Sequence, residues 1–165
     1  MTAINDQPFV VSRAFGAPRA RVWQAWTEVE HLKQWWGPKG FVVTHCNVDL
    51  RPGGLMHYCL RSPDGNDMWG RFVYREIVKP ERLIWVNSFS DEKGGITRHP
   101  MAPRWPREML TTVRFAEQGK GTLVTVQWVP INATEDERRM FDEGRASMQQ
   151  GWTGTFEQFE EYLGR

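Results

Sequence analysis

The sequence has few cysteines, almost no net charge and no long hydrophobic run. Two cysteines in 165 residues, Cys46 and Cys59, are too few for a disulfide scaffold of this length, so we expect reduced thiols. The 21 basic and 20 acidic side chains nearly cancel, which gives no electrostatic reason to expect nucleic acid as a partner. No run reaches about 18 apolar residues, and residues 1–10 do not resemble a secretory signal. We therefore expect a cytoplasmic protein without membrane insertion.

Patterns for metal binding or nucleophilic catalysis are also lacking. His45, Cys46 and Asp49 lie close in the sequence, but the first two point to opposite faces of a strand, so we expect neither a metal nor a cofactor. His57 and Cys59 share one strand face, but the alternate residues of that strand are more apolar and face inward. This arrangement turns the pair toward solvent, and we assign no catalytic residue.

Aromatic side chains are abundant. They make up 13% of the residues, with nine Trp and nine Phe, more than a core of this size needs for volume alone. Because ligand sites are mostly apolar and aromatic, some of these rings are expected to line a cavity. The length predicts a single domain over residues 1–165, with a core from about residue 8 to residue 164.

Local patterns predict a strand, two short helices, six further strands and a long helix. Residues 8–15 form the first strand, and Pro18 opens the first helix. Thr27 and Glu30 have the spacing of a capping box, which predicts a second helix ending at Trp36. The later strands are predicted over residues 40–49, 54–61, 67–78, 82–89, 108–116 and 121–129. Their short connections favour an antiparallel meander.

The segment from residue 90 to residue 107 is longer than most loops and contains three prolines. Such segments are often functional lids or poorly ordered. Trp105 therefore either caps the mouth of a cavity or packs the loop down.

The last element is predicted as one amphipathic helix of about seven turns or more. Thr134 and Glu137 form a second capping box at its start. The apolar residues fall within about 80° of one another; they are Phe141, Met148, Trp152, Phe156, Phe159 and Leu163. Gly144 and Gly151 share one flank, where each glycine costs about 1 kcal/mol relative to Ala. Close approach to the sheet or room for a ligand would explain them.

Arg145 is expected to project into this apolar face. A buried guanidinium needs an acceptor. Three partners remain open: Glu76 or another internal carboxylate, an anionic ligand group such as a fatty carboxylate, and solvent reached by snorkelling.

Several strings resemble one family of proteins: Ala17-Pro18-Arg19 with Trp26-Thr27, the run from His31-Leu32 to Trp35-Trp36-Gly37-Pro38, Arg51-Pro52-Gly53-Gly54, Pro63-Asp64-Gly65, Glu76-Ile77 with Pro80-Glu81-Arg82-Leu83, and Gly151-Trp152. From about Val10 to Leu163 the chain resembles the bacterial branch of the Activator of Hsp90 ATPase homologue 1-like family, within the SRPBCC, START-like and Bet v 1-like helix-grip superfamily. The resemblance implies an α+β fold in which a curved antiparallel sheet of about seven strands and a long C-terminal helix enclose an apolar cavity. Two short helices follow the first strand.

Strand parity then gives the expected cavity wall. The ligand-binding candidates are Tyr58, Phe72, Tyr74, Trp85, Asn87, Trp105, Trp128, Arg145, Met148, Trp152 and Phe156. Most are apolar, and Asn87 and Arg145 are the polar groups that would orient a ligand.

Three functions follow. The leading hypothesis is a non-catalytic carrier or sensor of a small apolar or amphipathic ligand. The second is a cyclase, hydrolase or dehydratase acting on an aromatic or polyketide-like substrate, with Glu76 and Tyr74 as acid-base groups, although an ion pair of Glu76 with Arg13 or Arg82 is the plainer interpretation. The third is a protein-interaction module, either a homodimer or a partner of an Hsp90-type chaperone. The Hsp90-activating members carry an additional N-terminal domain that contacts the chaperone, and these residues do not resemble it.

Overall fold

The computed structural model describes residues 3–165, so Met1 and Thr2 of the expected single domain lie outside the described residues. The elements follow one another in the predicted order. They are β1 (Phe9–Phe15), α1 (Arg19–Thr27), α2 (Val29–Trp35), β2 (Val42–Val48), β3 (Leu55–Arg61), β4 (Asp67–Val78), β5 (Arg82–Ser90), β6 (Ile96–Thr97), β7 (Glu108–Gln118), β8 (Gly121–Ile131), α3 (Glu135–Glu143) and α4 (Arg145–Leu163).

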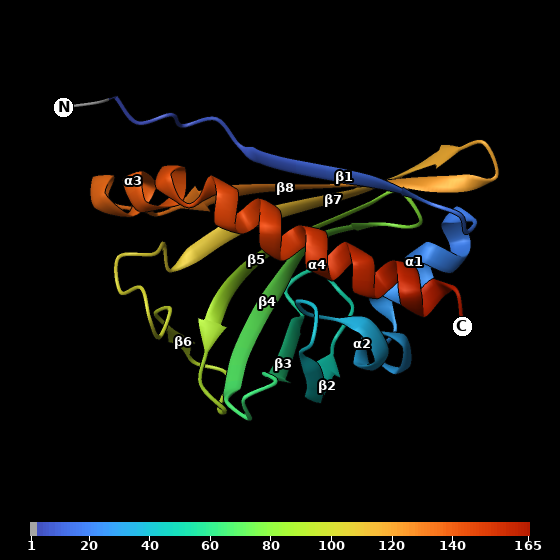
Figure 1. The fold of residues 1–165 in the computed structure, drawn as a ribbon, viewed down its shortest axis with the longest axis horizontal. Helices are drawn as coiled ribbons and strands as arrows, with labels where there is room; N and C mark the ends of the chain where they lie inside the picture. Colours follow the sequence, from blue (N-terminus) through green and yellow to red (C-terminus); the bar gives the residue numbers. More distant parts are fainter. Residues whose placement is uncertain (1–2) are drawn as a thin grey trace.

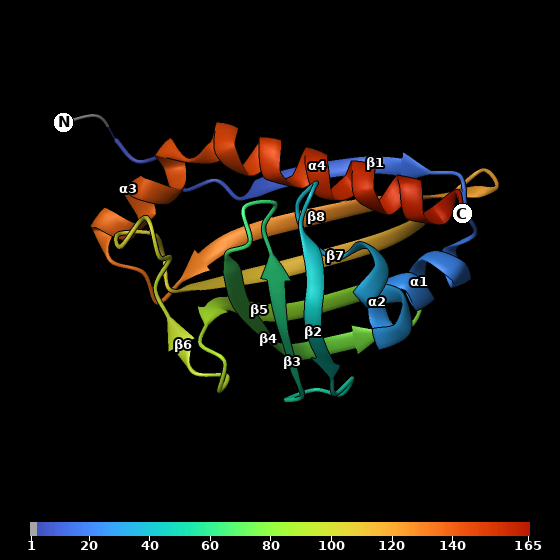
Figure 2. The ribbon, with the colours of Figure 1, turned by 60° about the horizontal axis from the view of Figure 1, so that its bottom comes forward.

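The strands form one antiparallel sheet in the order β1-β8-β7-β5-β4-β3-β2, and the short β6 pairs with β5. This confirms the predicted meander, to which β1 is added at the edge beside β8. The sheet is curved, with β2 to β4 running crosswise to β7 and β8 (Figure 2). It therefore presents a concave face.

The helix α4 lies along this concave face (Figure 1). At the C-terminal end of α4 lie α1 and α2, while α3 and the loop that contains β6 lie at its other end (Figures 1 and 2). None of the helices in the described part of the chain is long and apolar enough to cross a membrane.

Aromatic rings fill the end of the fold beneath α1 and α2. Trp26 is at the centre of this packing, with its ring centroid 4.9 Å from that of Trp35, 5.7 Å from Phe115 and 5.9 Å from Phe159. All four side chains are at most 2% exposed. Burying rings of this size contributes strongly to core stability. This end of the fold is therefore a closed aromatic core.

The first predicted capping box is wrong and the second is confirmed. Thr27 ends α1, where its hydroxyl donates to the carbonyl of Trp23 at 2.7 Å, so it cannot cap α2. Glu28 takes the N-cap position of α2 without a side-chain hydrogen bond. At α3, Thr134 Oγ1 accepts from the Glu137 backbone N–H at 3.1 Å, and Glu137 Oε1 accepts from the Thr134 N–H at 2.9 Å.

The predicted single C-terminal helix is two helices. Gly144 ends α3 and begins α4 with φ −89° and ψ 8°, outside the helical range. The indole of Trp105 lies against this glycine: an added Cβ would be 2.8 Å from Trp105 Cζ3. The helix therefore breaks where the loop side chain approaches the backbone.

Candidate functional site

A cavity of about 490 Å³ lies between the concave face of the sheet, α4 and the loop before β7. Its surface is mainly apolar, and it is partly open to solvent. Six of the predicted ligand-binding residues line it: Tyr58, Asn87, Trp105, Trp128, Met148 and Trp152. Strand parity and the helix stripe predicted five of these positions, in β3, β5, β8 and α4, and Trp105 comes from the long loop.

Two predicted wall residues, Phe72 and Trp85, are buried beneath the cavity. Their rings stack at 4.2 Å. Trp36 packs on both, at 5.6 Å and 6.4 Å, and lines the cavity in their place. Strand parity predicted the correct face of the sheet for Phe72 and Trp85. It could not predict that the indole of Trp36, at the end of α2, covers them.

Tyr74 and Phe156 are also absent from the cavity lining. The Tyr74 hydroxyl lies 3.9 Å from the Met56 sulfur, and its side chain is 1% exposed. Phe156 packs between Trp152 and Phe15, with centroids at 5.5 Å and 5.6 Å. Both side chains belong to the closed part of the core.

Sequence reasoning missed several lining residues, among them Trp36, Leu60, Met68, Phe89, His99 and Arg107. Leu60 and Met68 share strand parity with Tyr58 and Phe72, so consistent use of the alternation would have found them. His99 and Arg107 lie in the loop, where no periodic pattern exists.

The two helix glycines have different structural roles. A Cβ added to Gly151 would meet no atom within 4 Å, and this residue lines the cavity. Gly144 also lines the cavity, but a Cβ added there would collide with Trp105. Of the two explanations expected for these glycines, room for a ligand applies to Gly151. At Gly144 the close approach is to the loop and not to the sheet.

The loop between β5 and β7 is attached to the rest of the protein at several points. β6 pairs with β5, and Arg98 Nη1 donates to Glu137 of α3 at 3.1 Å. Trp105 packs on Phe141 with centroids 6.1 Å apart while it also lines the cavity. Trp105 thus packs the loop down, as one of the two alternatives predicts, and it is also part of the cavity wall.

The polar groups of the cavity are few. Asn87 Oδ1 accepts from the Thr111 hydroxyl at 2.5 Å. Burial raises the pKa of Tyr58 to about 12, although a hydrogen bond with Trp36 lowers it, so the phenol stays protonated near neutral pH. Burial lowers the pKa of His99, whose Nδ1 accepts the Met101 backbone N–H at 3.0 Å. A neutral histidine in this tautomer presents an Nε2–H.

Glu76 does not enter the cavity, contrary to the catalytic hypothesis. A register shift in β4 between Tyr74 and Glu76 interrupts the alternation that would have placed both on one face. Glu76 pairs instead with Arg82, whose Nε lies 3.1 Å from Oε1. The ion pair with Arg82, the plainer interpretation, is confirmed.

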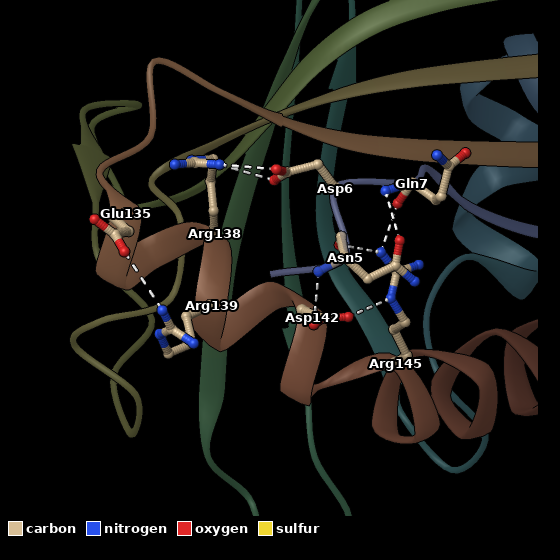
Figure 3. Close-up of polar contacts among 8 residues, drawn as sticks. All are labelled: Asn5, Asp6, Gln7, Glu135, Arg138, Arg139, Asp142 and Arg145. Atoms are coloured by element: carbon tan, nitrogen blue, oxygen red, sulfur yellow. Dashed lines mark hydrogen bonds and ion pairs between the residues drawn. The ribbon is translucent and has the colours of Figure 1, made fainter. Parts of the chain in front are cut away.

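Arg145 also lies outside the cavity lining, so its predicted position is wrong. Its Nε donates to Asp142 at 2.9 Å, and its guanidinium donates to the backbone carbonyls of Asn5 at 3.0 Å and Gln7 at 2.5 Å (Figure 3). Arg145 is the first residue of α4, where its long side chain turns back toward Asp142 and the N-terminal segment, so the helix wheel gives the position of its Cα but not of its guanidinium. Arg145 fastens the N-terminal segment, residues 5–8, to the helix junction.

The pair His57 and Cys59 is buried, not turned toward solvent. The side chains are 8% and 1% exposed, and the His57 ring stacks on Trp69 at 4.9 Å. The turn after β5 folds over this outer face of the sheet, where the Asp91 carbonyl lies 3.0 Å from His57 Nε2. Within residues 3–165 no group of three His, Cys, Asp or Glu side chains is placed to hold a metal ion.

A curved antiparallel sheet that holds a long C-terminal helix across its concave face, with a cavity between them, defines the helix-grip class of protein. The chain belongs to the Activator of Hsp90 ATPase homolog 1-like protein family, whose model matches residues 16–164. No curated protein matches the sequence.

Solved structures agree with this assignment. A crystal structure of a protein from Nitrosomonas europaea is similar with a TM-score of 0.74 and 27% identity, over 96% of this chain and 95% of that one. A solution structure from Arthrobacter aurescens has a TM-score of 0.78 and 24% identity, over 98% and 91% of the two chains. A crystal structure of an AHSA1 protein from Silicibacter pomeroyi has values of 0.71 and 16%, over 96% and 98%. The last two likenesses show the fold alone.

Proposed function

We propose that this protein binds a small hydrophobic or amphipathic molecule in the cavity between the sheet and α4, as a carrier or sensor. The observation that carries the proposal is the cavity itself, about 490 Å³ in volume and walled by the indoles of Trp36, Trp128 and Trp152. Small-molecule sites are apolar, aromatic clefts of roughly 300–1,000 Å³ with a few polar groups.

Gly151 supports a binding role over simple core packing. A helix-interior glycine is destabilising by about 0.5–1 kcal/mol relative to Ala, and at Gly151 no neighbouring atom requires it. The enzyme alternative lacks its named groups, because Glu76 pairs with Arg82 and the buried Tyr74 contacts Met56. Binding without chemistry is the function that these positions favour.

The test is a fluorescence titration with N-phenyl-1-naphthylamine, an uncharged probe whose emission rises in apolar sites. Gly151→Phe puts a ring into the space that the glycine leaves open, and Gln150→Phe adds the same ring to a neighbouring exposed position of α4. We expect Gly151→Phe to weaken binding at least about ten-fold and Gln150→Phe to bind like the wild type, with unchanged circular dichroism. Equal binding by all three proteins, or no binding by the wild type, would overturn the proposal.

A further inference from the structure

Three polar residues of the cavity lining, Asn87, His99 and Arg107, have hydrogen-bond donors without a partner among the described residues, and Arg107 is a cation. We infer that the ligand of this cavity is a hydrophobic organic monoanion, such as a carboxylate, whose charged group is held at the mouth by Arg107 while its apolar body lies against Trp152. This inference rests on the proposed function and adds the chemical class of its ligand.

The residues of β7 that face the inside of the fold become more exposed toward the start of the strand. Val113, Thr111 and Met109 alternate on its inner face, and Arg107 lies in the loop directly before the strand. Their exposure rises along this line from 0% at Val113 and Thr111 to 2% at Met109, and Arg107 is exposed. At about 3.4 Å per residue, the first residue of β7, Glu108, lies roughly 10 Å from Thr111 along the strand, and Arg107 precedes it. The side chains therefore change from buried core residues on the inner face of β7 to an exposed cation directly before the strand.

Arg107 is available to a ligand. In the part of the chain that the structure describes it has no hydrogen bond and no ion pair, whereas Arg98 of the same loop is paired with Glu137. A guanidinium keeps its charge and offers a fork of donors that matches a carboxylate.

Two neutral donors accompany this cation. Asn87, opposite Met109 in the sheet, uses its Oδ1 to accept from Thr111, which leaves its Nδ2 group without a partner among the described residues. The Nε2–H of His99 is also without a hydrogen-bond partner there. The amide orientation and the histidine tautomer follow from these hydrogen bonds.

Carboxylates are missing from the cavity lining. None of the described residues that form it is Asp or Glu. A ligand with a cationic group would find no counter-charge there, and an uncharged ligand would leave Arg107 unused. Charge complementarity thus favours an anion, because opposite charges orient a ligand at a partly exposed site.

The experiment compares two fluorescent probes that differ by one sulfonate, 8-anilinonaphthalene-1-sulfonate and N-phenyl-1-naphthylamine. Each is titrated into the wild type, Arg107→Gln and the control Arg104→Gln, an exposed loop arginine outside this cavity. We expect Arg107→Gln to weaken binding of the sulfonate about two- to five-fold, the range of an exposed ion pair, and to leave the uncharged probe unchanged. Arg104→Gln should alter neither.

Displacement of N-phenyl-1-naphthylamine by 1-naphthoate and by 1-naphthamide gives a second readout. 1-Naphthoate should compete better than 1-naphthamide for the wild type, and the two compounds should compete equally well for Arg107→Gln. If both arginine variants weaken sulfonate binding equally, or Arg107→Gln changes nothing while the uncharged probe still binds, the anion inference fails and the cavity proposal stands. Failure of the uncharged probe to bind the wild type overturns both.

Discussion

Alanine at the two glycines of the C-terminal helices should have opposite effects on stability. Gly151 lies inside α4, where glycine costs backbone entropy, and its added methyl would meet no atom within 4 Å. Gly151→Ala should therefore raise the free energy of unfolding by about 0.5–1 kcal/mol. The methyl would project into the cavity without displacing a side chain.

Gly144 should respond in the other direction. Its added Cβ would lie 2.8 Å from Trp105 Cζ3 and 3.2 Å from Cη2, closer than non-bonded carbons approach. The indole must then move away from Phe141, which it contacts in the folded protein. Overpacking of this kind lowers the free energy of unfolding by about 1 kcal/mol or more.

Urea denaturation followed by circular dichroism measures both changes on one scale. Two-state unfolding with an unchanged m-value is the control that the variants alter stability rather than the unfolded state. The reasoning is refuted if Gly151→Ala destabilises as much as Gly144→Ala, because the space beside Gly151 would then be filled.

Three further predictions concern the N-terminal segment and the thiols. Arg145→Ala removes the donors that hold residues 5–8 and should lower the free energy of unfolding by about 1–2 kcal/mol without changing N-phenyl-1-naphthylamine binding; a loss of probe affinity would contradict its position outside the cavity. The hydrogen bond from Arg145 holds the pKa of Asp142 below its usual range, so this carboxylate stabilises the fold above about pH 4 and loses its effect as the pH falls through the folded-state pKa. Asp142→Asn should accordingly reduce the loss of unfolding free energy at acidic pH, measured by urea denaturation. An unchanged loss would count against the ion pair of Asp142 with Arg145. Burial raises the pKa of Cys46 to about 11, although Lys33 lowers it, so a thiol reagent at about pH 8 should modify the unfolded chain and spare the folded one; rapid modification of the folded protein would show that the thiol is not buried.

The order of elements was predictable because alternation and turn chemistry are local. The expected strand limits agree with β2 to β8 within a few residues, apart from the two-residue β6 inside the long loop. Trp128 and Trp152 were also placed correctly, since each lies in a regular element whose period holds around it.

The misplaced residues lie beside interruptions of that regularity. The bulge in β4 turns Glu76 away from the cavity, and Arg145, at the start of α4 beside the break at Gly144, directs its guanidinium to Asp142 and the N-terminal segment. Neither irregularity leaves a local signal strong enough to locate it. Trp36 and Arg107 reach the cavity from a helix end and a loop, where the side-chain direction depends on tertiary contacts.

A crystal structure of the protein with N-phenyl-1-naphthylamine would show whether the probe binds in the cavity between the sheet and α4. We expect the naphthyl ring to lie against Trp152, in the space beside Gly151. Probe bound on the outer surface, with the cavity between the sheet and α4 filled by protein side chains, would contradict it.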